Sequence, residues 1–279
     1  MKKIFLGLTL LIVVVLAACC SNTRALAADT SWDDIKAKGY FLVTRSDGYS
    51  PMSFRDAGNK NVGFDVDLAD AVGRYLGIEA RPFIADWASK FIVLDNGDAD
   101  CIWCGFSITK DRLQQVIFTD PYLNDMQYIV VAANSSINNK ADIAGKTLAW
   151  QMGSSCENAI KADPIYAQLK DTRTYNTMPD ALQDMINGRV DAVVIDSVYF
   201  NYYAQESGTS DRYRVLEDNF GDDFMAVGVR LGDKAWGEKL NEALNAVMVS
   251  EEGIAIAEKW FGRNVFEEIK RTYDPSLIQ

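Results

Sequence analysis

The stretch GDADCIWCGFSITKDRLQQVIFTDPY, residues 97–122, runs from an apolar segment into small hydroxyl-bearing residues and then to a cation, Arg112. Its periodicity predicts a buried strand over residues 100–104. An arginine at the start of a helix gains nothing from the helix dipole, so a plain surface position explains Arg112 poorly. Ligands of α/β proteins bind at the carboxyl ends of strands. The stretch therefore predicts a cation just beyond the end of a buried strand, and what this cation faces has to come from the rest of the chain.

The rest of the chain alternates between predicted strands and helices in two successive series. The predicted strands are 40–44, 80–84, 100–104, 127–132, 147–150, 173–175, 192–195 and 224–229, and the predicted helices are 64–76, 90–95, 155–162, 179–187, 198–206, 233–250 and 251–260. Strands separated by helices predict mostly parallel sheets that are covered on both faces. Two such series predict two lobes around a cleft, with crossings near 128–133 and 224–229. The pattern alone also permits one continuous domain.

Composition excludes several classes of function. The 279 residues carry a formal net charge of −11, and an acidic chain repels phosphate backbones, so we expect no nucleic-acid binding. The chain has no histidine, which removes Ser-His and Cys-His catalysis and the commonest metal ligand. Cys101 and Cys104 have CxxC spacing, but residues three apart on a strand point to opposite faces, and no second CxxC exists. We therefore expect buried thiols, no metal and no cofactor.

The first residues are typical of a targeting signal. Two lysines precede an apolar run that is too short to span a bilayer comfortably. The run ends Leu-Ala-Ala-Cys, which resembles a bacterial lipobox, so we expect residues 1–18 to be a signal peptide and Cys19 to be lipidated. Residues 19–31 then form a tether. Cys20 is an alternative acylated residue, and the small residues at 25–28 leave an ordinary secretory signal open.

Four motifs occur together along most of the chain. They are YSPMSFRDAGNKNVGFDVDLADAVGRYLG at 49–77, the opening stretch at 97–122, GSS at 153–155 and NGRVDAVVIDS at 187–197. With these motifs the chain resembles the extracytoplasmic solute-binding proteins of polar amino acid ABC importers, from about residue 32 to residue 262. The resemblance implies an α/β, two-lobed periplasmic-binding-protein-like fold joined by two hinge strands. Lobe 1 would comprise 32–131 and 226–279, and lobe 2 would comprise 132–225.

The resemblance also implies a function. Such a protein captures a free amino acid between two closing lobes and delivers it to an ABC permease, so we expect a monomer anchored by lipid at the outer face of the cytoplasmic membrane. The alternative is an enzyme on the same scaffold, a cyclohexadienyl-dehydratase-like lyase, whose substrate would have little use for an ammonium-binding carboxylate if it lacked an amine. The sensor lobe of a kinase or receptor, a third possibility, needs a membrane span after the lobes.

The family motifs imply which residues contact the ligand. In the family the arginine of the SIT..R motif clamps the ligand α-carboxylate, and its match is Arg112, whose planar guanidinium can donate two parallel hydrogen bonds. Ser107 and the backbone at Gly105 are expected to add donors. The family's carboxylate for the α-ammonium matches Asp196, which could otherwise cap the next helix. Arg112 and Asp196 come from different lobes, so the site is complete only when the cleft closes.

Further contacts are implied in both lobes. Gly153, Ser154 and Ser155 precede a predicted helix whose N-terminal N–H groups can receive an anion, although without the family match they would be only an N-cap turn. Tyr49 and Trp87 match positions where the family stacks rings on the ligand, although aromatic side chains usually fill cores.

Cys104 is expected at the cleft, where many relatives have a small hydroxyl residue. Cys156 follows the lobe 2 motif that touches the same ligand carboxylate in relatives, so closure could bring the two thiols together. The alternative is that each thiol packs inside its own lobe.

Overall fold

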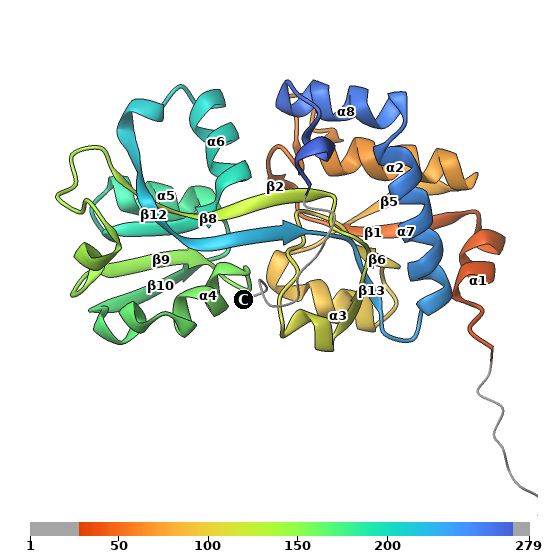
Figure 1. Cartoon of the computed structure of the whole chain (residues 1–279), viewed down its shortest axis with the longest axis horizontal. Coiled ribbons are helices and arrows are strands. Elements are labelled where there is room, and N and C mark those ends of the chain that lie inside the picture. Colours follow the sequence, from red (N-terminus) through yellow and green to blue (C-terminus); the bar gives the residue numbers. More distant parts are fainter. Residues whose placement is uncertain (1–27, 270–279) are drawn as a thin grey trace, which may run out of the picture.

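Two long strands, β8 (Leu123–Ala132) and β12 (Tyr213–Met225), pair with each other and connect two lobes (Figure 1). The computed structural model describes residues 28–269, so the predicted signal peptide and Cys19 lie outside the described residues. Each lobe is built around a five-stranded sheet flanked by helices. This arrangement confirms the predicted two-lobed α/β fold. The predicted residue boundaries of the lobes stay a prediction.

Lobe 1 has the strand order β5-β1-β6-β13-β7. Its strands are β1 (Tyr40–Arg45), β5 (Glu79–Ile84), β6 (Cys101–Ile102), β7 (Val116–Phe118) and β13 (Gly228–Arg230), and a small separate sheet contains β2 (Gly48–Tyr49), β3 (Ser53–Arg55) and β4 (Asn61–Val62). Its helices are α1 (Ser31–Lys38), α2 (Phe64–Leu76), α3 (Lys90–Asp95), α7 (Lys234–Met248) and α8 (Glu251–Phe261). β1 is parallel to β5 and β6, whereas β13 is antiparallel to β6 and β7.

Local sequence explains how the lobe 1 helices are placed. The apolar residues of α2 recur on one face, so Leu68 and Val72 are fully buried, and Gly77 ends the helix in the left-handed conformation. In α7, Trp236 is also fully buried, and its ring centroid lies 5.2 Å from that of Phe41 on β1. These contacts hold the helices against the sheet whose strand ends face the cleft.

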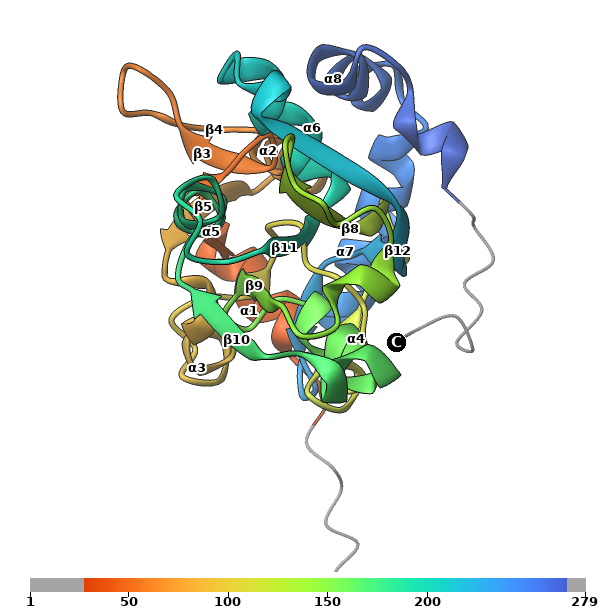
Figure 2. The same cartoon turned by 90° about the vertical axis from the view of Figure 1, so that its left-hand side faces the viewer.

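Lobe 2 has the strand order β10-β9-β11-β8-β12. The strands that belong to it alone are β9 (Thr147–Gln151), β10 (Asp171–Tyr175) and β11 (Ala192–Asp196), and its helices are α4 (Cys156–Ala162), α5 (Met178–Ile186) and α6 (Ser197–Glu206). Figure 2 views this lobe from its outer side. Val193 packs in the same cluster as Leu182 of α5, and Val194 in the same cluster as Ile160 of α4. Because neighbouring strand residues point to opposite faces, α4 and α5 cover opposite sides of the sheet.

Short 3-10 helices connect these elements. They are η1 (Trp87–Ser89), η2 (Arg112–Gln114), η3 (Lys140–Ile143), η4 (Pro164–Gln168), η5 (Ser210–Arg212) and η6 (Val265–Glu268). Within residues 28–269, no helix combines the length and the apolar character that crossing a membrane requires.

The predicted strand at 224–229 is wrong. β12 extends far upstream of that range and ends at Met225, and β13 begins at Gly228 in the sheet of lobe 1. The pattern missed the long strand because polar side chains are exposed in its middle, at Glu217 and Asp218. The sheets are also mixed rather than mostly parallel, since β8 is antiparallel to both β11 and β12 and β13 is antiparallel to both β6 and β7. The other predicted elements lie within a few residues of their expected bounds.

Replacing Gly63 with alanine should destabilise the protein more than the same change at Gly77. Both glycines have a positive φ, but a Cβ at Gly63 would overlap the carbonyl oxygen of Met52, whereas a Cβ at Gly77 would meet open space. Gly77→Ala should therefore lower the free energy of unfolding by about 1 kcal/mol, because alanine is strained in the left-handed conformation. Gly63→Ala should lower the free energy of unfolding by at least twice as much in urea titrations. Equal losses would contradict this account of how α2 begins.

Candidate ligand-binding site

One pocket lies between the lobes, where strand ends of both sheets meet. Its lining residues are Ser46, Tyr49, Trp87, Cys104, Gly105, Ser107, Arg112, Gln151, Ser154, Ser155 and Asp196. The structure thus brings together all the predicted ligand contacts except Gly153, and it adds Ser46 and Gln151. Arg112 and Asp196 are the charged residues of this lining, one positive and one negative.

Arg112 is 5% exposed and sits at the lobe 1 side of the pocket. Its guanidinium donates to two backbone carbonyl oxygens, that of Ser107 at 2.7 Å and that of Gly153 at 3.1 Å. Burial lowers the pKa of Arg112 to about 10, while the carboxylates of Asp223 and Asp196 act in the opposite direction. The group is therefore charged at neutral pH. Both acceptors are neutral carbonyl groups, so they do not balance the positive charge of Arg112. An anion in the pocket would balance it.

A buried carboxylate that the sequence analysis did not single out fixes the turn after β6. Asp65, in the first turn of α2, accepts hydrogen bonds from the Gly105 N–H at 2.7 Å and the Tyr122 hydroxyl at 3.0 Å. Burial raises the pKa of Asp65 to about 7. Gly105 has a φ of +52°, and a Cβ there would overlap the ring of Tyr49. The chain leaves the sheet at Ile102, earlier than the predicted strand end, and this turn carries it along the pocket.

Lobe 2 supplies hydroxyl and carbonyl groups from the turn before α4. The Ser155 hydroxyl donates to Asp223 at 2.8 Å and accepts from the Ser107 hydroxyl of lobe 1 at 3.0 Å. Gly153 lies just outside the lining, and its carbonyl oxygen accepts from Arg112. Ser155 precedes α4 but its side chain makes no cap hydrogen bond, so this turn is more than an N-cap. Hydroxyl groups from the two lobes thus meet beside the guanidinium.

Asp196 is the buried carboxylate on the lobe 2 side of the pocket. It precedes α6, yet its side chain makes no cap hydrogen bond. Instead its Oδ2 accepts from the Tyr49 hydroxyl at 2.5 Å and its Oδ1 accepts from the Gln127 amide at 2.7 Å. Burial, followed by the charge of Asp223, raises the pKa of Asp196 to about 6. The Tyr49 ring also stacks on Tyr199, with 5.5 Å between centroids, so lobe 1 contacts lobe 2 at this carboxylate.

Lys90 is a second buried basic side chain, at the edge of the pocket, and the sequence pattern did not indicate it. Its Nζ donates to the carbonyl oxygens of Gly153 at 3.0 Å and Trp87 at 3.1 Å, and it lies 4.6 Å from the centroid of the Trp87 ring. Burial, followed by the charge of Arg112, lowers the pKa of Lys90 to about 6. A lysine that begins a short helix usually points to solvent, so the sequence carried no signal. Here it links lobe 1 to lobe 2.

The three cysteines within residues 28–269 are buried and free. Burial raises the pKa of each thiol, so Cys101, Cys104 and Cys156 stay protonated near neutral pH. The Cys104 sulfur accepts from the Ser46 N–H of lobe 1 at 3.5 Å, and Cys156 packs in the lobe 2 cluster that contains Trp150. The lobes are in contact in this structure, yet Cys104 and Cys156 are not joined. Each thiol contacts a group of its own lobe, as in the alternative to an approach on closure, although Cys104 also lines the pocket as expected.

This geometry, an anion site and a cation site facing each other across two lobes, agrees with what comparison with known proteins shows. Residues 42–263 match the model of bacterial extracellular solute-binding proteins, family 3. The chain belongs to this family. The solute-binding protein is 27% identical to the L-cystine-binding protein TcyJ of Escherichia coli strain K12 over 269 residues, which covers 95% of this chain and 99% of that protein. It is 26% identical to the arginine-binding extracellular protein ArtP of Bacillus subtilis strain 168, over 90% of this chain and 97% of that protein.

Solved structures show the same two-lobed architecture. An ABC uptake transporter substrate-binding protein from Streptococcus pneumoniae, solved with bound histidine, superimposes with a TM-score of 0.81 at 33% identity and covers 85% of this chain and 98% of that one. The ancestral amino acid-binding protein AncCDT-1, a precursor of cyclohexadienyl dehydratase, gives a TM-score of 0.74 at 29% identity over 82% and 98% of the two chains. The solute-binding protein therefore shares its two-lobed fold with proteins that are named for amino acid binding.

Asp65→Asn should change how stability depends on pH. The pKa of Asp65 is raised from 3.8 to about 7, so the folded state holds a proton that the unfolded chain releases in this window. The wild type should therefore lose free energy of unfolding, relative to the variant, as pH rises from about 4 to about 7. The slope should approach about 1 kcal/mol per pH unit. Urea titrations at several pH values measure the free energy of unfolding of both proteins. Parallel pH dependences for the wild type and the variant would contradict the raised pKa of Asp65.

Proposed function

We propose that this solute-binding protein is a lipid-anchored monomer that captures one free amino acid between its lobes and delivers it to an ABC permease. The observation that carries the proposal is the pocket in which buried Arg112 of lobe 1 and buried Asp196 of lobe 2 are the charged lining residues. A free amino acid has one carboxylate and one ammonium group, so it matches both charges at once. The family membership and the relatives named for amino acids support the same conclusion.

Ligand binding and lobe closure are coupled in this proposal. The groups that face the pocket now contact each other across the lobes, Tyr49 with Asp196 and Arg112 with the Gly153 carbonyl. A ligand ammonium would take a place beside Asp196, and a ligand carboxylate would accept from Arg112 with help from Ser107. Because the two charged partners belong to different lobes, the ligand binds the closed arrangement better than an open one and shifts the population toward it.

The other pocket walls favour a neutral ligand side chain. Trp87, Cys104, Ser46 and Gln151 carry no formal charge at neutral pH and complete the lining. A charged ligand side chain buried among them would lack a counter-charge in the lining, which costs several kcal/mol. A calorimetric screen of the twenty amino acids plus cystine and ornithine tests both points. We expect a neutral amino acid to bind most tightly, and binding by none of them would refute the proposed function.

The lyase alternative fits the pocket less well. Asp196 is buried in the lining, and a substrate without an amine would leave its carboxylate without a cation. Incubation with a prephenate-like acid should therefore give no turnover.

Arg112→Ala should weaken amino acid binding by roughly 2 to 5 kcal/mol, because the ligand carboxylate would then be buried without its cation. Arg112→Lys should recover only part of the affinity, since an ammonium group cannot donate two parallel hydrogen bonds. Lys110→Ala is the matched control, because Lys110 is an exposed cation two residues away and should leave affinity unchanged. Calorimetry measures all three. Unchanged affinity in both folded Arg112 variants would remove Arg112 from the ligand site.

Lipidation should hold the protein at the outer face of the cytoplasmic membrane. Cys19 lies outside the described residues, so the lipobox resemblance alone supports this part of the proposal. A diacylglyceryl group supplies the two chains that stable attachment requires. Because Cys20 could substitute, the double variant Cys19→Ala, Cys20→Ala should move to the soluble fraction, with the single Cys20→Ala variant as the control that stays in the membrane. A double variant that remains in the membrane fraction would contradict lipid anchoring.

A further inference from the structure

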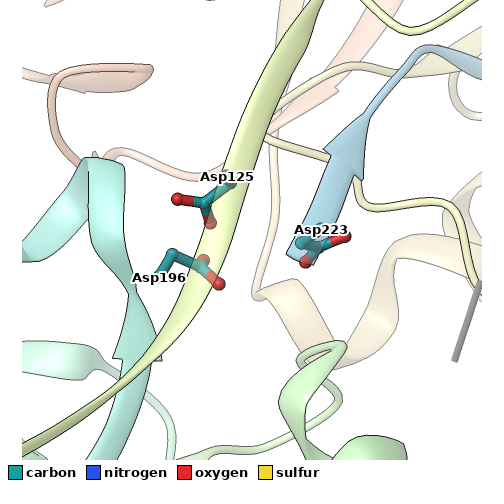
Figure 3. Close-up of side chains that lie close together, drawn as sticks. All are labelled: Asp125, Asp196 and Asp223. Atoms are coloured by element: carbon teal, nitrogen blue, oxygen red, sulfur yellow. The ribbon is translucent and has the colours of Figure 1, made fainter. Parts of the chain in front are cut away.

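Three carboxylates are buried together at the hinge, behind the ligand pocket (Figure 3). Asp125 lies on β8, Asp223 on β12 and Asp196 at the end of β11. One oxygen of each lies within 4.8 Å of the others, and the three residues are 6 to 7% exposed. Asp125 and Asp223 are direct partners in the antiparallel pairing of the hinge strands. Like charges in that position destabilise a strand pair, so the cluster needs a counter-charge.

Neutral donors account for the hydrogen bonds of the cluster. Asp125 Oδ1 accepts from the Ser197 hydroxyl at 2.5 Å and the Val198 N–H at 3.0 Å. The Gln127 amide nitrogen lies between two of the carboxylates, 2.7 Å from Asp196 and 2.8 Å from Asp223. Such donors orient the oxygen atoms but add no positive charge. Arg112 offers one positive charge near Asp196 and Asp223, which is fewer than three ionised carboxylates require. Burial and the two neighbouring carboxylates raise the pKa of Asp125 well above its usual range, so its ionised form needs a further cation.

Two buried oxygen atoms at the cluster have no hydrogen-bond partner within residues 28–269. They are Asp125 Oδ2 and Gln127 Oε1, and Gln127 is 2% exposed. Figure 3 shows one oxygen of Asp125 directed toward Asp196. The ends of a glutamine amide differ only in their hydrogen bonding, so a half-turn of this amide would place Oε1 where the nitrogen now lies, between Asp196 and Asp223. These two oxygen atoms accept no hydrogen bond, so both are free to coordinate a hard cation.

An amino acid in the ligand pocket cannot neutralise the whole cluster. Of the three carboxylates only Asp196 lines that pocket. Asp125 and Asp223 line a different, more open pocket on the hinge, together with Asn124 and Ser197. The hinge pocket therefore opens a path to Asp125 and Asp223 that is separate from the pocket of the amino acid.

We propose that Asp125, Asp196, Asp223 and Gln127 form a binding site for a divalent metal ion, with Ca²⁺ the best match. All the candidate ligand atoms are oxygens, most of them carboxylate oxygens, and such sets suit Ca²⁺ rather than the transition metals that prefer nitrogen or sulfur. Two positive charges against three negative ones leave one negative charge, which is what the ammonium group of an amino acid at Asp196 requires. The bound ion would join both hinge strands to β11. The sequence predicts no metal because it has no histidine and no second CxxC, and these three aspartates are far apart in the chain.

The test uses the full chain, stripped of metal with a chelator and kept free of amino acids, so that its outcome does not depend on the proposed function. CaCl2 is titrated by calorimetry and by thermal unfolding, with MgCl2 in parallel. We expect one Ca²⁺ per chain and a melting temperature that rises with Ca²⁺ concentration. Mg²⁺ should bind more weakly, because it demands a stricter octahedral geometry.

Two charge-removing variants and a matched control locate the site. Asp125→Asn and Asp223→Asn should each weaken Ca²⁺ binding by about 10-fold or more. Glu217→Gln removes the same charge from an exposed position of β12 and should bind Ca²⁺ like the wild type. A cooperative thermal transition of each variant shows that it is folded. No Ca²⁺ binding by the wild type, or equal binding by the wild type and both aspartate variants, would overturn the proposal. A melting temperature that changes with pH but not with Ca²⁺ would also overturn it, because protons would then neutralise the carboxylates.

Discussion

The buried guanidinium of Arg112 is the constraint on which the cleft depends. Moving a charged group out of water costs several kcal/mol unless other groups match its charge. Here two backbone carbonyl oxygens hold it, one from Ser107 of its own lobe and one from Gly153 of the other. Lys90 donates to the same Gly153 oxygen, so two basic side chains of lobe 1 converge on one carbonyl of lobe 2. An anion in the pocket would satisfy this positive charge and favour the closed lobes at the same time.

The negative side of the cleft is tied to the hinge. Gln127 on β8 contacts Asp196 in the ligand pocket and Asp223 on the other hinge strand. Asp223 in turn accepts from Ser155, whose hydroxyl meets Ser107 of lobe 1. One hydrogen-bonded network therefore joins the hinge to both ends of the proposed ligand. A change in charge at the hinge would therefore alter the hydrogen bonds of the pocket, because Gln127 contacts both Asp223 and Asp196.

Sequence reasoning worked where the signal is local. The bounds of α2 and α3 were predicted to the residue, since an apolar face and a terminal glycine such as Gly77 lie within the helix itself or beside it. The residues of the pocket were predicted from family motifs. A motif shows which residues meet in the folded protein, even when they are far apart in the chain. Asp65 and Lys90 were missed because what buries them lies far away in the chain, and charged residues in short helices usually face solvent. The acidic cluster was missed for the same reason, and β12 because exposed polar residues hide its pattern.

The central claim is that both ends of a free amino acid are recognised, one by each lobe. The most direct test compares, by calorimetry, the amino acid that binds most tightly with its methyl ester and with its N-acetyl derivative. The ester removes the charge that Arg112 would match, and the acetyl group removes the charge that Asp196 would match. Each derivative should bind about 30-fold more weakly or worse, equivalent to about 2 kcal/mol. A derivative that binds within a few-fold of the parent amino acid would show that one of the two charges is not recognised, and the account would fail.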